Sequence, residues 1–435
     1  MKKLMLAIAV FTMPFTMQAQ FGNLLEKAKS KINSRANNKI DQGMEGALDK
    51  VEAGVKKPGS ATSSKPAEAK DGDGEEKEVE ESGQPAKMSV NSKFDFVPGE
   101  RIIYSEDFAQ DVIGELPLTW NASGKGEVQT INGKQGKWLR VFQNNTYLSG
   151  NKKDFGENFT VEFDAIYFFQ PKLSGYVMPD ISFGLFSTGE EDNLENKFLQ
   201  DQNSLNSAII NLHPSGAGGA YMSSYKTRAR TFGSDRSVLN EYSKYHNKVM
   251  HYAIQIQKTR FRMWINQDKV FDVPRGVNTN ALLNQIYFHM ESSNYKDEEV
   301  GFYVSNIKVA TGLPDTRHKL VEEGKFSTTG ILFDFQSATI RPESYGVIKE
   351  IGSVLKENPA IKINIIGHTS NDGDANANLA LSKLRSAAVK DVLVKEYAID
   401  AARLTTDGKG GSQPVGDNKT TEGKAQNRRV EFIKL

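Results

Sequence analysis

The sequence predicts a multidomain protein in which a β-sandwich precedes a smaller α/β domain. Residues 94–312 contain many short, evenly spaced strand-like segments and no long helical pattern, which is typical of two packed sheets. Residues 326–435 alternate strand-like and helix-like segments, which predicts helices packed on a sheet. At 435 residues the chain has room for both domains and for further segments before them.

The composition excludes several classes of protein. The 55 basic and 54 acidic side chains give a formal charge of +1, so we expect no nucleic-acid partner. The absence of cysteine excludes disulfides, thiolate metal sites and cysteine nucleophiles. The six histidines are scattered and form no HExxH pattern, so we expect neither a metal nor any other cofactor.

Residues 1–19 are predicted to be a signal peptide. Lys2 and Lys3 precede an apolar run over residues 4–15, and an alanine stands before the expected cleavage at Gln20. The run is shorter than the roughly 20 residues that a membrane-spanning helix needs, and no later apolar segment is long enough either. The missing cysteine also excludes a lipidated amino terminus. The sequence therefore predicts an exported protein.

Residues 20–56 are predicted to form a short helical segment. Their apolar side chains recur at spacings of three, four and seven residues: Leu25, Ile32, Ala36, Ile40, Met44, Leu48, Val51 and Val55. Gly43 and Gly46 weaken this pattern. Three interpretations stay open, which are a weak helix, a helix that associates with itself or touches a membrane, and a segment without fixed structure.

Residues 57–93 are predicted to be a disordered acidic linker. They are rich in Pro, Ser, Gly, Ala, Lys and Glu, with DGDGEEKEVEES at their centre. Such a segment cannot bury enough apolar surface to offset the entropy of ordering. As a flexible coil it would reach roughly 35 Å between its ends, which suits a tether.

The β-sandwich is predicted from strand-like segments within residues 94–312. These segments are residues 101–104, 137–142, 159–169, 181–186, 208–212, 250–257, 260–265, 285–290 and 301–310. Residues 250–271 read as a meander with tight polar turns. The turn at Asn266, in WINQDKVF, gives this region a resemblance to the concanavalin-like, or laminin G-like, jelly rolls.

Two features of the sandwich point to possible functions. Glu190, Asp192 and Glu195 spell ExDxxE, but a glycosidase needs its paired carboxylates on one strand, facing one cleft about 5 Å apart. These acids follow Ser-Thr-Gly and favour a solvated acidic loop instead. Five aromatic residues would stack on sugars if exposed, or would belong to the core or to a protein contact: Trp120, Tyr221, Tyr225, Tyr242 and Tyr245.

The carboxyl-terminal domain follows a charged linker at residues 313–325. Its predicted strands are residues 330–335, 361–367, 403–408 and 428–433, and its predicted helices are residues 342–358 and 376–397. Pro342 suits the first turn of a helix. The alternation predicts a compact α/β sandwich.

Four motifs in this domain carry a specific family resemblance. LFDFQSATIRPE, GHTSNDGDANANLALSKLRSAAV, DGKGGSQPV and TEGKAQNRRVEF stand in the order and spacing of the OmpA-like peptidoglycan-binding domain. The resemblance covers residues 326–435. It implies a βαβαβ-type sandwich and, as ligand, the meso-diaminopimelate of the peptide stems of peptidoglycan.

The resemblance also implies the site residues. Arg385 aligns with the family arginine that binds the diaminopimelate carboxylate, and a guanidinium does so with two parallel hydrogen bonds. Asn378, Thr369 and neighbouring backbone N–H groups would complete the cradle. Arg428 is assigned a binding role, although the sequence leaves open whether Arg428 or Arg429 faces the site. The competing interpretation of Arg385 is a surface salt bridge.

One position departs from the family pattern. The family has an acid directly after Gly-His-Thr, and this chain has Ser370, so the usual partner of the ligand ammonium is missing. Losing a charge-assisted hydrogen bond would weaken binding by roughly one to two orders of magnitude. Asp372 and Asp374 lie in the same loop, and Asp372 is the preferred replacement because the chain can bend at Gly373.

These observations predict a non-catalytic cell-envelope protein of a Gram-negative bacterium. It would bind peptidoglycan non-covalently in the periplasm, or on the periplasmic face of the outer membrane with peripheral association. The β-sandwich would bind a carbohydrate or a protein. The alternatives are an envelope enzyme that acts on glycans and is tethered to the wall, and an interaction subunit of a secretion or motility assembly.

Overall fold

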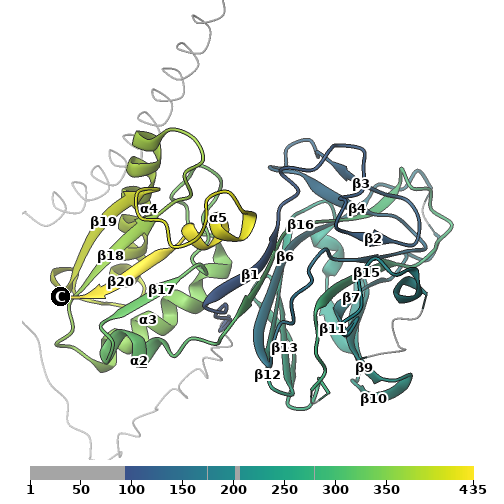
Figure 1. Ribbon diagram of the computed structural model, residues 1–435, viewed down its shortest axis with the longest axis horizontal. Helices are drawn as coiled ribbons and strands as arrows, with labels where there is room; N and C mark the ends of the chain where they lie inside the picture. Colours follow the sequence, from purple (N-terminus) through teal and green to yellow (C-terminus); the bar gives the residue numbers. More distant parts are fainter. Residues whose placement is uncertain (1–93, 174, 201–205, 279) are drawn as a thin grey trace, which may run out of the picture. The chain divides into compact units, whose positions relative to one another are not determined.

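The computed structural model describes residues 94–435, apart from residues 174, 201–205 and 279 (Figure 1). The predicted signal peptide, helical segment and linker, at residues 1–19, 20–56 and 57–93, lie outside the described residues. The described residues fall within one compact unit of the chain. They comprise the β-sandwich and the α/β domain.

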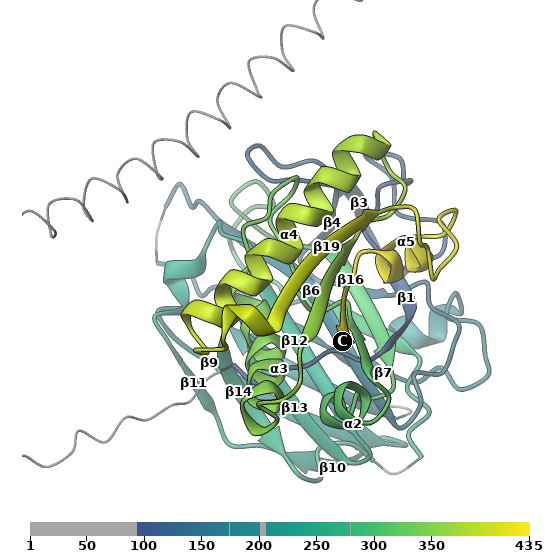
Figure 2. The ribbon, with the colours of Figure 1, turned by 90° about the vertical axis from the view of Figure 1, so that its left-hand side faces the viewer.

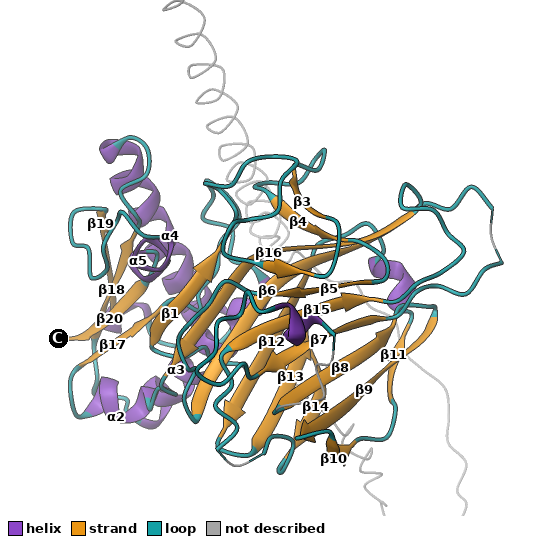
Figure 3. Cartoon of the chain, turned by 45° about the vertical axis from the view of Figure 1, so that its right-hand side comes forward, coloured by secondary structure: helices purple, strands orange, loops and turns teal. Residues whose placement is uncertain are grey.

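The sandwich consists of two eight-stranded antiparallel sheets (Figure 3). The first has the order β14-β13-β12-β6-β16-β4-β3, and β1 also pairs with β16. Its strands are β1 (Arg101–Glu106), β3 (Gly126–Gln129), β4 (Trp138–Val141), β6 (Asn158–Phe169), β12 (Met250–Gln257), β13 (Arg260–Ile265), β14 (Asp268–Val273) and β16 (Val300–Thr311).

The second sheet has the order β10-β9-β8-β7-β15-β5-β2, and β11 also pairs with β9. Its strands are β2 (Asn121–Ala122), β5 (Asn145–Leu148), β7 (Ile181–Phe186), β8 (Ser207–His213), β9 (Ala217–Lys226), β10 (Ala229–Gly233), β11 (Ser237–Asn240) and β15 (Gln285–Met290). Short 3-10 turns stand at Asn196–Leu199 (η1) and Tyr242–Tyr245 (η2).

An aromatic cluster joins the two sheets. Phe163 of β6 stacks on Tyr252 of β12, with ring centroids 4.9 Å apart. From the opposite sheet, Phe183 and Phe288 meet Phe163 edge-on, at 5.5 and 5.2 Å. These side chains are almost fully buried. Large rings that point inward from alternate positions therefore fill the space between the sheets.

The predicted sandwich is confirmed, and each of its nine predicted segments is a strand. Asn266 has φ of 52°, as the predicted tight turn between β13 and β14 requires. Two of the five aromatic residues considered as sugar platforms are buried, so for them the alternative of a core role holds. Trp120 is 3% exposed and stacks on Phe288, and Tyr242 is 2% exposed and shares a 2.7 Å hydroxyl contact with Tyr252.

The α/β domain has a four-stranded sheet in the order β17-β20-β18-β19, of which only β18 and β19 are parallel. Its strands are β17 (Lys325–Thr328), β18 (Ile363–His368), β19 (Leu404–Gly410) and β20 (Val430–Lys434). The helices are α2 (Thr316–Val321), α3 (Tyr345–Glu357), α4 (Ala375–Lys395) and α5 (Thr421–Asn427), with 3-10 turns at Pro342–Ser344 (η3) and Ala401–Arg403 (η4). In Figure 2, α4 runs along β19, and it also packs against β18.

The predicted strand at residues 330–335 is wrong. The strand beside β20 is β17, and residues 330–335 contribute only an isolated bridge between Phe333 and Ile340. A turn explains this, because the Asp334 N–H donates to the Thr339 carbonyl. The sequence also did not predict the helices α2 and α5. Helix α2 begins inside the predicted linker, where the Asp315 side chain caps it by accepting from the N–H of His318.

A buried charge network links the sandwich to the α/β domain. Asp164 of β6 is 3% exposed and lies 2.8 Å from Nδ1 of His251, a residue of β12. Its carboxylate also accepts from Asn306 of β16 at 2.9 Å and from Arg341 of the α/β domain at 3.2 and 3.3 Å. Glu162 lies 3.3 Å from Nε2 of His251. Three strands and the second domain therefore share one buried carboxylate.

This network predicts a pH-dependent stability. Burial alone would lower the pKa of His251, but Asp164 and Glu162 raise it to about 9. The resulting stabilisation is complete below the unfolded-state pKa of about 6.5 and is lost as the pH rises through 9. We expect the free energy of unfolding to fall by at most about 3 kcal/mol between about pH 6.5 and 9.5, as measured by urea denaturation.

The variant His251→Gln should remove most of this pH dependence, whereas the exposed His318→Gln should retain it. If the free energy of unfolding of His251→Gln still fell with pH as in the wild type, His251 would not be the source of the pH dependence.

Candidate functional site

The candidate site is the loop that joins β18 to α4, residues 369–374. Gly367 lets α4 lie close to β18, because a Cβ at this position would stand 2.2 Å from the Ser382 carbonyl oxygen. The Thr369 N–H donates to the Gly410 carbonyl at the end of β19, at 3.0 Å. The loop therefore begins at the carboxyl ends of two parallel strands, where α/β folds commonly bind ligands.

Thr369 and Ser370 form the buried start of the loop, and each is 6% exposed. The Thr369 hydroxyl donates to the Ser370 carbonyl at 2.8 Å, and the Ser370 hydroxyl donates to Asp372 Oδ2 at 3.0 Å. Both predicted site residues therefore use their side chains to shape the loop.

Asn378 and Asp374 hold the rest of the loop. The Asn378 amide donates to the Asp372 carbonyl at 2.8 Å. Asp374 caps α4 by accepting from the Ala377 N–H at 2.8 Å. Gly373, with φ of 83°, supplies the predicted bend. The capping role leaves Asp372 as the more available of the two acids in the loop.

Asp372 is exposed but already has a cationic partner. Nζ of Lys424, on α5, lies 2.7 Å from Asp372 Oδ1. Partial burial would raise the pKa of the Asp372 carboxyl, but the hydrogen bonds from Lys424 and Ser370 lower it overall. The acid is therefore charged at neutral pH, and both of its oxygens are engaged.

Arg385 lies half-buried on α4, facing the segment that precedes α3. Its Nε donates to the Ser337 carbonyl at 3.0 Å, and its guanidinium carbon stands 4.8 Å from the centre of the Phe333 ring. Burial, and then the charge of Arg428, lower the pKa of Arg385 to about 10, so it stays protonated at neutral pH. Its Nε contact leaves the terminal nitrogens available for a ligand.

The structure separates the roles of the two consecutive arginines. Arg429 is 5% exposed and binds Glu431 Oε1 through Nε and Nη2, at 2.9 and 2.7 Å. Its Nη2 also donates to the Gln413 carbonyl at 3.1 Å. Arg428 is exposed and close enough to Asp107 and Asp372 to feel both charges. Arg429 therefore braces the domain, and Arg428 lies beside the loop.

Sequence reasoning assigned no role to Lys424 or to Asn427, although both lie in TEGKAQNRRVEF. Asn427 is fully buried and accepts from the N–H groups of Val415 and Gly416, at 2.7 and 2.9 Å. Its amide donates to Asn418, which in turn accepts from the Asn371 N–H. This chain of amides fixes two loops against each other. Spacing along the chain gives no signal for such contacts.

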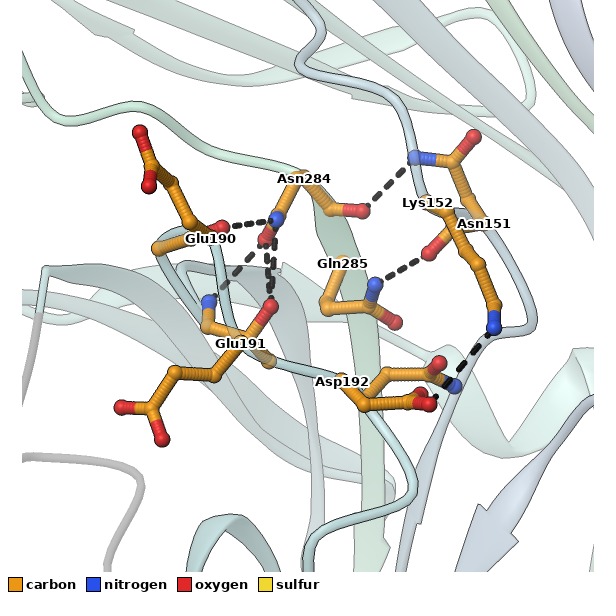
Figure 4. Close-up of a pocket in the computed structure, with 10 residues that line it drawn as sticks. Asn151, Lys152, Glu190, Glu191, Asp192, Asn284 and Gln285 are labelled. Carbon is orange, nitrogen blue, oxygen red and sulfur yellow. Dashed lines mark hydrogen bonds and ion pairs between the residues drawn. The ribbon is translucent and has the colours of Figure 1, made fainter.

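The acidic segment of the sandwich forms a separate polar cavity of ≈ 260 Å³ (Figure 4). Glu190 and Glu191 point away from Asn284 and Gln285, whereas Asp192 points toward Lys152. The acids of the ExDxxE motif, Glu190, Asp192 and Glu195, are exposed in a loop, as the sequence predicted. Paired carboxylates facing one cleft, as glycosidases require, are not present among these residues.

The part of the chain that the structure describes contains no group of three His, Cys, Asp or Glu residues placed to hold a metal ion. No helix in the same residues is long and apolar enough to cross a membrane.

The domain thus combines a four-stranded α/β fold with two arginines beside the β18–α4 loop. Comparison with known families identifies this domain, because residues 332–428 match the OmpA family. The chain therefore carries an OmpA family domain, as the motifs predicted. The match includes none of the sandwich.

Individual relatives share only part of their length with this chain. Outer membrane porin F of Pseudomonas aeruginosa is 42% identical over 101 residues, 23% of this chain and 29% of that protein. The probable lipoprotein YiaD of Escherichia coli is 41% identical over 102 residues, 23% of this chain and 46% of YiaD. The peptidoglycan-binding protein ArfA of Mycobacterium bovis is 34% identical over 103 residues, 24% of this chain and 31% of ArfA.

One of the similar solved structures is the cell wall anchor of the T6SS from Pseudomonas aeruginosa. It is 31% identical, with a TM-score of 0.24, and the match covers 26% of this chain and 80% of that chain. The chain spans less than half the length of the three curated relatives named above.

The two arginines should differ in their effect on stability. Arg429→Met leaves the buried Glu431 with fewer partners, so we expect a loss of about 3 kcal/mol in the free energy of unfolding. Arg428→Met, on the surface, should change it by less than about 0.5 kcal/mol. Urea denaturation of both variants measures this difference, and equal losses would show that Arg429 is no brace.

Proposed function

We propose that this protein is a non-catalytic cell-envelope protein that binds peptidoglycan non-covalently through residues 326–435. The observation that carries the proposal is the pair Arg385 and Arg428 beside the β18–α4 loop. In the described part of the chain, neither guanidinium has a carboxylate oxygen within 4.0 Å. Two cations that no carboxylate contacts directly favour a ligand that supplies one.

The diaminopimelate of the peptide stem has the required chemistry. Its free carboxylate matches the terminal nitrogens of Arg385, which Ser337 and Phe333 hold in place. A guanidinium that is already oriented loses less conformational entropy on binding. Arg428 adds positive charge at the same loop, while Thr369, Ser370 and Asn378 keep the loop in shape.

The names of two relatives support this proposal. ArfA is named a peptidoglycan-binding protein, and porin F is an outer membrane protein. We therefore place this protein in the periplasm, or peripherally on the periplasmic face of the outer membrane.

Arg385→Ala tests the proposal by sedimentation with purified peptidoglycan sacculi. Removing charge-assisted hydrogen bonds should weaken binding by roughly 10- to 100-fold, so the wild-type protein pellets and the variant stays in solution. Lys383→Ala, an exposed change on the same helix, should pellet like the wild type. Equal pelleting of Arg385→Ala and the wild type would remove Arg385 from the site.

We also propose that the sandwich binds a hydroxyl-rich ligand, such as a carbohydrate, at the cavity of Figure 4. Asn193 lines this cavity and is 2% exposed, and its Oδ1 has no hydrogen-bond partner. Its amide nitrogen is held by the carbonyls of Thr119 and Ser149, at 3.1 and 3.0 Å. A buried acceptor without a donor is costly, and a ligand hydroxyl would satisfy it.

A panel of neutral saccharides tests this second proposal by calorimetry. Asp192→Asn, at the rim of the cavity, should weaken binding several-fold, whereas Tyr221→Ser, exposed elsewhere on the sandwich, should have no effect. Weaker binding by Tyr221→Ser together with unchanged binding by Asp192→Asn would favour stacking on exposed aromatic residues instead. Release of soluble fragments from glycans would instead favour the enzyme alternative, and capture of an envelope protein in place of a saccharide would favour the interaction subunit.

A further inference from the structure

The charge distribution around the β18–α4 loop differs from that of a site for a zwitterion. A group that carries both an ammonium and a carboxylate needs a free acid and a free cation, set apart. The cations are present in Arg385 and Arg428. The acid partner is less clear, because the residue directly after Gly-His-Thr is the uncharged Ser370.

The loop contains two acids, and both are committed within the protein. Asp374 caps α4 through the Ala377 N–H. Asp372 contacts Lys424 Nζ through Oδ1 at 2.7 Å and accepts from the Ser370 hydroxyl through Oδ2 at 3.0 Å. A ligand ammonium would have to displace Lys424, which exchanges one ammonium for another and gives little net attraction.

The acids near the loop differ from the cations in what they contact. Arg385, Arg428 and Lys424 contribute three positive charges, and Asp372, Asp374 and Asp107 contribute three negative charges. Each of the three acids accepts a hydrogen bond from the protein, and for Asp107 the donor is the Ala109 N–H at 3.0 Å. A ligand carboxylate therefore meets the terminal nitrogens of Arg385, whereas a ligand ammonium meets acids that already have donors.

We propose that this site recognises the carboxylate of its ligand and not the ammonium, because Lys424 occupies the position of that ammonium. The inference rests on the proposed function and specifies the ligand for the same site. It follows that a diaminopimelate whose side-chain amine is acylated, as in a cross-linked stem, is bound as well as one whose amine is free.

The full-length protein without its signal peptide tests the proposal by isothermal titration calorimetry. The probes are a stem tripeptide that ends in diaminopimelate, the same peptide acetylated on its free side-chain amine, and the same peptide amidated on the adjacent carboxylate. Acetylation should change the affinity by less than about threefold, and amidation should weaken it at least about tenfold. A loss of tenfold or more on acetylation would overturn the proposal.

Lys424→Met tests the role of the lysine. The change frees Asp372, so the unmodified peptide should now bind about tenfold or more tightly than the acetylated one. Lys419→Met, an exposed lysine in the loop before α5, is the matched control and should keep the wild-type ratio. A variant Lys424→Met that still does not discriminate between the two peptides would show that Lys424 does not replace the ammonium.

Two further outcomes separate the possible failures. If acetylation weakens binding to the wild type and Asp107→Asn removes this effect, Asp107 is the acid partner and the proposal is wrong. If no peptide binds and the wild type does not pellet with sacculi, the proposed function itself fails. Pelleting together with a strict need for the free amine would retain the function and reject only this inference.

Discussion

The buried carboxylate of Asp164 is the constraint on which the arrangement of both folded parts depends. A charge removed from water must be surrounded by partners, because leaving it unpaired costs several kcal/mol. Here the partners come from β12, from β16 and, through Arg341, from the α/β domain. A shift of register between Ser305 and Lys308 in β16 places Asn306, with φ of 52°, within reach of this carboxylate.

The open edge of β1 extends this connection toward the candidate site. Gln426 of α5 accepts from the Ile102 N–H at 2.8 Å and donates to the Glu100 carbonyl at 3.0 Å. Glu422 accepts from the Ser105 N–H at 3.3 Å. These side chains satisfy backbone groups that an edge strand would otherwise leave unpaired. Since α5 also carries Lys424, the contact with the sandwich helps to place the cation that holds Asp372.

The sequence predicted which segments form strands and helices better than it predicted which residues contact one another. Strand-like composition and tight turns identified the long strands β6, β12 and β16, whose residues are buried on both faces over most of their length. The prediction of a strand at residues 330–335 was wrong. This apolar run has the composition of a strand, but it turns back at Asp334 and does not pair with the sheet. The sequence left open whether Trp120 and Tyr242 lie in the core or at the surface, because aromatic residues carry no sequence signal of which face they occupy, and both are buried.

The sequence by itself determined the two-sheet sandwich and the α/β domain with its OmpA family motifs, and it singled out Arg385 as a candidate site residue. These depend on local periodicity and on motifs several residues long, which are written along the chain. Only the tertiary structure decided that Arg429 is a brace, that Arg428 lies beside the loop and that Lys424 pairs with Asp372. The reason is physical: contacts such as Arg429–Gln413 and Lys424–Asp372 join residues 16 and 52 positions apart, and only the folded backbone brings them together.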